Sequence, residues 1–169
     1  MTTDNNTTAL LYAAHGNLTL LAALLDAGAD ANHRDGTGWS GLNSAIYANS
    51  ADCTRLLINA GAAVDARCDA GMTPLDHCIS LHQGRARRGD AAGSERQRRL
   101  YPILLRAGAS LPAETDDAYL RKVRAAGGFR QYERAHLNAL AAPFLPKPPS
   151  LPPELVRRVV EFAFHVGDY

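Results

Sequence analysis

The sequence predicts an all-α fold, a short solenoid of helix pairs joined by loops. Three apolar segments close in the same way, on Ala-Gly-Ala at Gly28, Gly61 and Gly108. Glycine readily adopts the left-handed conformation that ends many helices. The first two glycines are 33 residues apart and the last two 47, which is one period plus 14. Recurrence at such a period is typical of repeated units that bury their apolar faces against their neighbours.

The length of 169 residues fits one compact domain or a short array with an appendage. The hydrophobic fraction of 46% is enough for a core. The three cysteines have neither zinc-site nor disulfide-framework spacing, no secretory signal is evident, and no apolar run approaches the length of a membrane span. We therefore expect a soluble intracellular protein with reduced thiols, cytoplasmic by default, with an organelle not excluded.

The charges are unevenly divided along the chain. Residues 1–82 hold eight acidic and three basic side chains, whereas residues 83–169 hold nine acidic and fifteen basic ones. This difference in charge either steers partners toward one end of the molecule or has no role, the two parts simply having solvated faces of different composition.

The first two units follow one plan, in which two helices are followed by a loop rich in Asp, Asn and Gly. The expected segments are helices 9–14 and 18–25 with loop 29–39, then helices 42–48 and 52–59 with loop 62–72.

The third unit is predicted to begin at Thr73, which can cap a helix, with Pro74 in the first helical turn. Residues 83–97 form an arginine-rich insertion without apolar periodicity, so we expect an extruded loop there, which accounts for the 14 extra residues. The companion helix is expected at about 96–106. Pro102 should kink that helix or delay its start.

Gly71-Met72-Thr73-Pro74-Leu75 resembles the signature of the ankyrin repeat, which is Gly, any residue, then Thr-Pro-Leu-His. The segments 40–43 and 8–11 are degenerate copies, and the resemblance covers residues 7–112, or three repeats. The family histidine, which ties neighbouring repeats by hydrogen bonds, is replaced here, so we expect a less rigid array than a consensus one. The replacing residues are Leu11, Asn43 and Asp76.

Residues 113–142 are expected to form a helical-pair cap. Thr115 should cap its first helix, which stops at Gly127-Gly128, and an antiparallel partner should follow. The pair carries more charge than the repeats, as a terminal cap with one solvated face should. Its sequence also resembles an extension that follows ankyrin repeats in some algal proteins.

Residues 143–153 form a proline-rich spacer, and residues 154–166 are predicted to be an amphipathic C-terminal helix. That helix docks either on the protein's own repeats or on another protein, through Leu155, Val159 and Phe162. The segment Leu151-Pro152-Pro153-Glu154-Leu155 is similar to the opening of an F-box, which implies recruitment of a cullin-type ubiquitin ligase.

No catalytic, metal or cofactor site is predicted. Asp76, His77 and Cys78 are consecutive in a helix, so their side chains cannot converge. We also expect no small-molecule substrate. The arginine-rich insertion could contact phosphates, but it has no interleaved aromatic residue for base stacking, so nucleic acid is disfavoured.

The ankyrin resemblance implies a non-enzymatic scaffold or accessory subunit that binds a protein, either alone or within a larger complex, through its finger loops and the concave face of its first helices. The alternative is a substrate adaptor of a cullin-type ubiquitin ligase. Trp39, the single tryptophan, is either an exposed anchor or a side chain folded back over its loop. The expected partner-binding residues are Arg34, Thr37, Trp39, Tyr47, Arg67, Asp69, Met72 and Ser80.

Overall fold

A computed structural model of the chain describes residues 3–141 and Glu154. It divides into one unit that ends at Ser110 and another that begins at Leu111. Within the described residues the regular structure is helical, apart from a single antiparallel bridge between Arg34 and Ser40, so the predicted all-α class is confirmed. The predicted spacer 143–153 and all of the predicted C-terminal helix except Glu154 lie outside the described residues.

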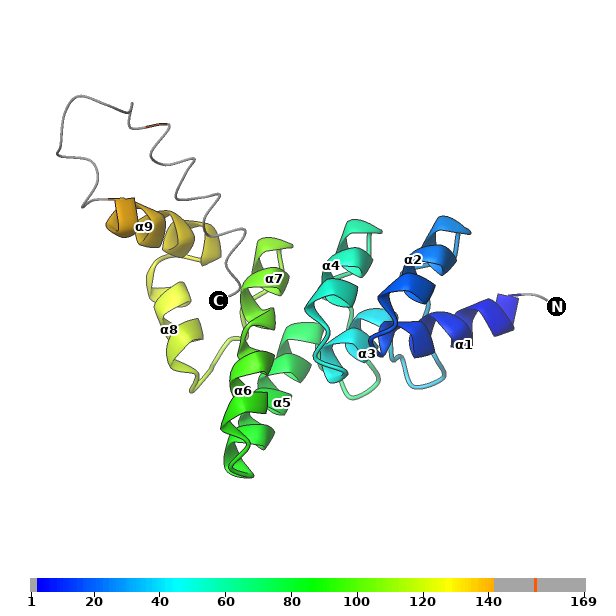
Figure 1. Cartoon of the computed structure of the whole chain (residues 1–169). Helices are drawn as coiled ribbons and strands as arrows, with labels where there is room; N and C mark the ends of the chain where they lie inside the picture. The colour runs from blue at the N-terminus through cyan, green and yellow to red at the C-terminus, as the bar shows by residue number, and fades with distance from the viewer. Residues whose placement is uncertain (1–2, 142–153, 155–169) are drawn as a thin grey trace. The chain divides into compact units, whose positions relative to one another are not determined.

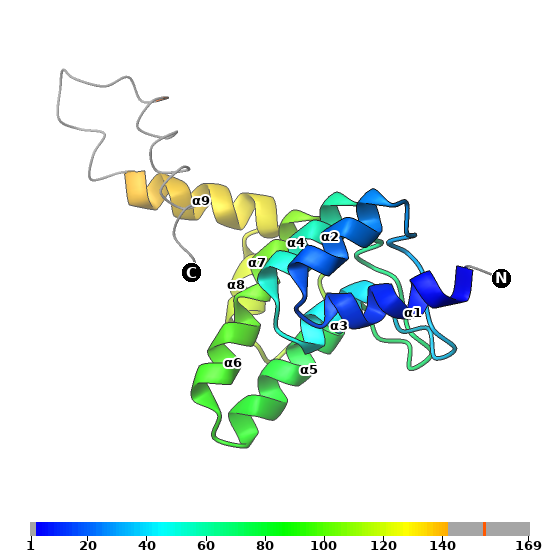
Figure 2. The ribbon, with the colours of Figure 1, turned by 45° about the vertical axis from the view of Figure 1, so that its right-hand side comes forward.

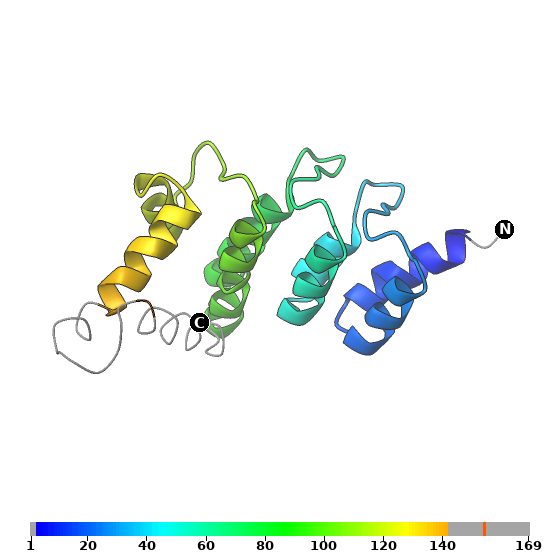
Figure 3. The same ribbon diagram turned by 90° about the horizontal axis from the view of Figure 1, so that it is seen from above.

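The first unit is a stack of helix pairs (Figure 1). Helices α1, α3 and α5 pack against one another in an inner layer, while α2, α4 and α7 form an outer layer. The loops 29–39 and 62–72, here called the fingers, project on the same side of this stack (Figure 3). The helices are α1 (Thr3–Ala14), α2 (Leu18–Asp26), α3 (Gly41–Tyr47), α4 (Ala51–Asn59), α5 (Pro74–Arg87), α6 (Ala91–Arg98) and α7 (Leu100–Arg106).

Leucines from each helix pair form the core between the two layers. These side chains are at most 1% exposed, and removing one by substitution with alanine typically costs about 2–5 kcal/mol of stability. The core leucines are Leu10, Leu21, Leu42, Leu57, Leu75 and Leu104.

The three glycines that define the repeat do end the outer helices, as predicted. Each has a positive φ, 85° at Gly28, 87° at Gly61 and 96° at Gly108. The N–H of the following residue then donates back to a leucine carbonyl near the helix end, which satisfies a group that the helix leaves unpaired. The accepting carbonyls belong to Leu24, Leu57 and Leu104.

The expectation of a loop at residues 83–97 is wrong, because most of this segment is helical. Helix α5 continues to Arg87, and after a short turn α6 runs antiparallel to it (Figure 2). Asp90 begins α6, because its carboxylate accepts a hydrogen bond from the N–H of Gly93 at 2.8 Å. A Cβ on Gly93 would collide with that carboxylate, so the glycine permits the cap. We call residues 83–99 the basic hairpin.

The proline in the third unit interrupts its helix, as expected. Helix α6 ends at Arg98 and α7 begins at Leu100. Pro102 has no N–H to donate to the carbonyl of Arg98, and its ring would clash with that carbonyl in a continuous helix. The break therefore falls four residues before the proline.

The second unit contains α8 (Ala118–Ala125) and α9 (Phe129–Ala141), which pack against each other. The residue that caps α8 is Asp117 rather than Thr115, because its carboxylate accepts the N–H groups of Tyr119 and Leu120. No helix in the described part of the chain is long and apolar enough to cross a membrane.

Candidate partner-binding surface

Four rings from three successive helix pairs form a continuous line on the inner layer, here called the aromatic row. The ring of His15 lies 5.8 Å from that of Tyr47, and Tyr47 lies 6.5 Å from Trp39. Trp39 in turn contacts His77 edge-on, with 4.6 Å between ring centroids. Edge-to-face packing of this kind is favourable beyond the area it buries. The row therefore links α1, α3 and α5.

Trp39 is half-buried, and its indole lies back across α3. Its Nε1 donates a hydrogen bond to the hydroxyl of Ser44 at 3.0 Å. Because Trp39 immediately precedes Ser40, the residue that caps α3, the start of the helix fixes the direction of the tryptophan backbone. The indole is held in place before any partner binds.

The aromatic row is exposed at one end and partly buried at the other. Tyr47 is 52% exposed, and Tyr12, one turn before His15 in α1, is 75% exposed. At the opposite end, burial lowers the pKa of His77, and its Nδ1 is buried with no hydrogen-bond partner in the described structure. His77 is consequently neutral at pH 7, so the row presents uncharged rings there.

The two predicted finger arginines support the loop backbone. Arg34 donates from Nη1 to the carbonyl oxygen of Arg67 at 2.9 Å, and Arg67 donates to the carbonyl of Gly71 at 2.6 Å. The backbone N–H of Asp69 donates to the carbonyl of Thr37 at 3.2 Å. The first finger therefore rests on the second, while the side chains of all four predicted residues stay exposed.

Asp35 organises the first finger. Although partial burial opposes its ionisation, hydrogen bonds from Thr37 and from the N–H of Trp39 lower the pKa of this carboxyl. The charged carboxylate thereby fixes the turn that leads into Trp39.

Two residues that the sequence analysis missed join each finger to the next unit. Asn32 donates to the carbonyl of Gly61 at 3.0 Å and accepts the N–H of Ala63 at 2.7 Å. Asp65, one 33-residue period later, accepts the N–H and the hydroxyl of Ser110 at 2.9 and 2.7 Å. Both side chains can form hydrogen bonds, and each lies four residues after a closing glycine. This shared position is the signal that could have revealed them.

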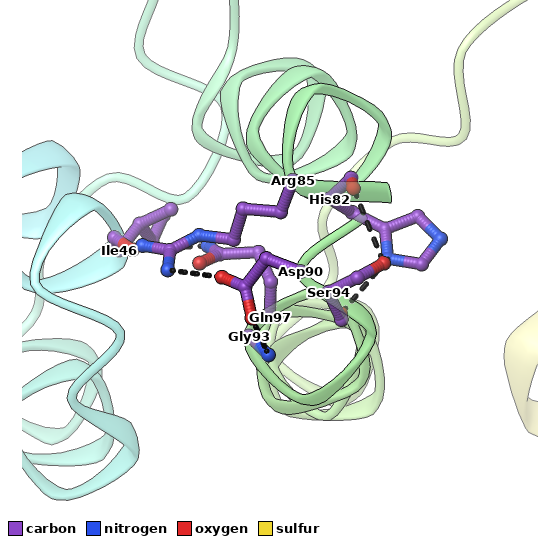
Figure 4. Close-up of polar contacts among 7 residues, drawn as sticks. All are labelled: Ile46, His82, Arg85, Asp90, Gly93, Ser94 and Gln97. Atoms are coloured by element: carbon purple, nitrogen blue, oxygen red, sulfur yellow. Dashed lines mark hydrogen bonds and ion pairs between the residues drawn. The ribbon is translucent and has the colours of Figure 1, made fainter. Parts of the chain in front are cut away.

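The basic hairpin is held by polar contacts (Figure 4). The hydroxyl of Ser94 and the ring Nδ1 of His82 are 2.9 Å apart, which links α6 to α5. Arg85 forms a 3.6 Å ion pair with Asp90. Gln97 is fully buried and donates from Nε2 to the carbonyl of Ile46 in α3 at 3.0 Å. The hairpin is therefore attached to the repeats and not extruded from them.

The expected partner-binding residues separate into groups. Trp39 and Tyr47 meet in the aromatic row, and the finger residues Arg34, Thr37, Arg67 and Asp69 adjoin one another. Ser80 is exposed on α5 one turn after His77, and Met72 is half-buried in the second finger. The sequence analysis did not assign His15 or His77, the two ends of the row, to a partner-binding surface. The predicted docking residues Leu155, Val159 and Phe162 lie outside the described residues.

In residues 3–141, no three His, Cys, Asp or Glu side chains gather in an arrangement that could hold a metal ion. The features that stand out are a stack of helix pairs, braced fingers and a line of ordered rings that is exposed at one end. They define a helical repeat domain with a preformed surface.

Comparison with known families identifies the class of repeat. Residues 9–87 match the family described as ankyrin repeats in three copies. This segment is an ankyrin-repeat array, as the resemblance in the sequence indicated, and the match ends at Arg87, the last residue of α5, before the turn of the basic hairpin.

The curated proteins that are similar to this chain include two that are named for ankyrin repeats. Cortactin-binding protein 2 of Rattus norvegicus is 48% identical over 64 residues, covering 37% of this chain and 4% of that protein. Ankyrin repeat and SOCS box protein 3 of Homo sapiens is 31% identical over 112 residues, 66% of this chain and 20% of that protein. Ankyrin repeat and SAM domain-containing protein 6 of Rattus norvegicus is 35% identical over 80 residues, 47% of this chain and 9% of that protein. The chain thus spans a fifth or less of the length of these relatives.

Proposed function

We propose that this protein is a non-enzymatic interaction module that binds a protein partner through the aromatic row. The observation that carries the proposal is that ordered rings from three successive helix pairs lie on one surface, with Tyr47 more than half exposed. Trp and Tyr are the residue types that most often dominate binding energy at protein interfaces. Trp39 and Tyr47 are the proposed anchors.

The preformed geometry favours binding energetically. Side chains that are already fixed lose little conformational freedom when a partner docks. Ser44 and His77 hold the indole of Trp39, and its neighbour Tyr47 presents a rigid ring with a hydroxyl. A partner that buries either ring gains apolar contact at low entropic cost.

The fingers supply the polar rim of the proposed interface. Arg34 and Arg67 use one N–H group each to brace the loops, so the remaining guanidinium donors stay available to a partner. Thr37, Asp69, Met72 and Ser80 complete the proposed surface. A rim of this kind contributes to specificity more than to affinity.

The names of two relatives accord with a role in assemblies, since one is named for binding cortactin and another for combining ankyrin repeats with a SOCS box. We place this chain in the same general role, as a scaffold or accessory subunit. The substrate-adaptor alternative depends on residues 154–166, and deletion of residues 151–169 tests it: loss of ligase capture with retention of the other partner would favour the adaptor.

Site-specific photocrosslinking tests the proposed surface. A photoreactive phenylalanine analogue is placed at Tyr47 in the full chain, and at Leu20 as the control. Leu20 is similarly exposed, at 44%, but belongs to the outer-layer helix α2. We expect a discrete crosslinked protein from position 47 and none from position 20. Equal products at both positions, or none at 47, would contradict the proposal.

A quantitative version uses the captured partner with alanine variants. Tyr47→Ala should weaken binding by about 2 kcal/mol if the ring is a buried anchor. Leu20→Ala should leave binding unchanged. Both variants should retain the wild-type helical circular dichroism, so a difference in binding reports the surface and not the fold.

A further inference from the structure

We propose that the partner segment bound by this protein carries acidic residues beside its apolar anchor, and that Arg87 and Arg88 of the basic hairpin receive them. This inference rests on the proposed function, because it extends the aromatic row along α5. It names the chemistry of the partner: an acidic peptide segment with an aromatic or aliphatic anchor at one end.

One face of α5 continues from the aromatic row to the arginines. His77, which contacts Trp39, shares a helical face with Ser80 and Gly84, three and seven residues later, and this face continues to Arg87 and Arg88. The opposite face carries the buried Leu75, Cys78 and Ile79. Because that face packs into the core, the face with the arginines points to solvent.

The middle of this face is open. A Cβ placed on Gly84 would lie 3.7 Å from a guanidinium nitrogen of Arg88, and no other helix or loop would come within 4 Å. The Arg88 side chain therefore lies along α5 over Gly84, toward the row. Ser80, between Gly84 and His77, is small and exposed. A peptide could lie along this face without displacing any side chain of the repeats.

Arg87 and Arg88 have no counterion of their own. Both are exposed, and neither forms an ion pair or side-chain hydrogen bond in the described structure. Other arginines of the hairpin are engaged, Arg85 with Asp90 and Arg98 with Glu95 at 2.8 Å. Arg96 and Arg99 on the α6 side of the hairpin are also exposed and without an ion pair in the described structure, so what distinguishes Arg87 and Arg88 is that they share the side of α5 that carries the row.

Charge fixes the direction in which such a segment would lie. The repeats before the hairpin are acidic, with eight acidic and three basic residues in positions 1–82. Acidic residues of a partner are therefore repelled from the fingers and attracted to the hairpin, while its apolar anchor fits the uncharged rings. From His77 to Arg88 is 11 residues, or about 16 Å of helix. This length corresponds to about five residues of an extended peptide.

A carboxylate-bearing peptide is favoured over nucleic acid on this surface. The extension of α5 beyond Gly84 offers no aromatic side chain on which bases could stack. The two guanidinium groups on this face of α5 suit bidentate pairing with a few carboxylates, whereas backbone binding of nucleic acid usually engages more cations.

Selection from a random 16-residue peptide library displayed on phage, against the full chain, tests the inference. We expect enriched peptides to combine an aromatic or aliphatic anchor with Asp or Glu about five positions away. Selected peptides are then synthesised with a fluorophore, and affinity is measured by fluorescence anisotropy. The variants are Tyr47→Ala and the double substitution Arg87→Ser with Arg88→Ser, and the control with matched loss of charge is Arg121→Ser with Lys122→Ser on α8.

The double arginine variant should weaken binding of selected peptides about 3- to 10-fold at low salt, with the difference shrinking as salt is added. The α8 control should bind like the wild type. Anchored peptides that depend on Tyr47 but show no acidic preference would overturn this inference and leave the proposed function standing. Enriched peptides that ignore Tyr47, or no enriched peptides at all, would count against both. A 20-base-pair DNA duplex that binds through Arg87 and Arg88 more tightly than any selected peptide would assign the arginines to phosphate and overturn the inference.

Discussion

The amide nitrogen of Gln97 donates a hydrogen bond to the carbonyl oxygen of Ile46 at 3.0 Å, which joins the basic hairpin to the end of α3 in the preceding repeat. Ile46 lies in the last turn of α3, where helix carbonyls have no partner within the helix. The same carbonyl also accepts the N–H of Asn49. The inserted segment thus adds a second hydrogen bond to a backbone carbonyl of its neighbour.

Replacing Gln97 should therefore destabilise the repeats. Gln97→Ala removes the hydrogen bond and leaves a cavity, so we expect a loss of about 2–3 kcal/mol in the free energy of unfolding. Gln97→Leu keeps most of the volume and should cost about 1 kcal/mol or less, because it also removes the buried Oε1, which has no hydrogen-bond partner. Urea denaturation followed by circular dichroism measures both. An equal loss in both variants would mean that the hydrogen bond, and not the packing, dominates.

Asp90 should control the stability of the basic hairpin. Asp90→Ala removes the cap of α6 and the ion pair with Arg85, and we expect a loss of about 1 kcal/mol concentrated in the hairpin. Hydrogen–deuterium exchange should show faster exchange at residues 88–94 with little change in α3 and α4. Asp90→Asn, which can still cap the helix, should exchange nearly like the wild type. Uniformly faster exchange across all repeats would contradict a local role.

The repeat plan was predictable from the sequence because it depends on backbone requirements that few residues meet. Only glycine readily supplies the positive φ at Gly28, Gly61 and Gly108. Thr73 and Pro74 likewise predicted the start of α5, where the hydroxyl of Thr73 accepts the N–H of Asp76 in a capping box.

The basic hairpin was not predictable in the same way, because polar side chains hold it. Ser94 and Gln97 are buried through hydrogen bonds, and neither contributes to an apolar pattern. A search for amphipathic periodicity therefore finds nothing between residues 83 and 97 and interprets the segment as a loop.

The candidate site was only partly predictable. Trp39 and Tyr47 stood out as large aromatic residues at repeat positions that contact partners in the family. His77 was examined as part of a consecutive triplet, although the 33-residue period aligns it with Ser44, which lies beneath the Trp39 indole. Arg34 and Arg67 were assigned to a partner from their charge, but their bonds to backbone carbonyls depend on the loop conformation.

The three thiols should differ in reactivity. Burial raises the pKa of Cys78 to about 12, and the hydrogen bond from Gln97 opposes this increase with a smaller effect. Cys53 is also fully buried. Because the thiolate is the reactive form, we expect Ellman's reagent at pH 8 to titrate one cysteine, Cys68, in the folded protein and three after denaturation. Two or three fast-reacting thiols without denaturant would show that the core around α4 or α5 opens readily.

The stability of the protein should fall as the medium is acidified past the ordinary pKa of histidine, partly because of His77. Its pKa is lowered in the folded state, so between that value and 6.5 the unfolded chain binds a proton that the folded chain does not. The contribution of neutral His77 is complete above pH 6.5 and is lost as pH falls through this window.

His77→Gln isolates this contribution. We expect the difference in thermal midpoint between pH 7.5 and pH 5.5 to be smaller in the variant than in the wild type, whatever the change in absolute stability. The NMR signal of the His77 ring should titrate with a midpoint below 6.5. A midpoint at or above 6.5 would refute the burial of this ring against Trp39.

The place at which the third repeat is lengthened has a practical consequence. Helix α5 leaves the second finger and ends 14 residues later, so the turn at residues 88–90 lies at the end of the helix pair remote from the fingers. Extra length at that end adds turns to two helices and leaves the stacking interval of the units unchanged. An epitope or a fluorescent reporter could consequently be inserted at Gly89, which keeps Arg88 and the Asp90 cap of α6 in place and preserves the registration of the neighbouring repeats.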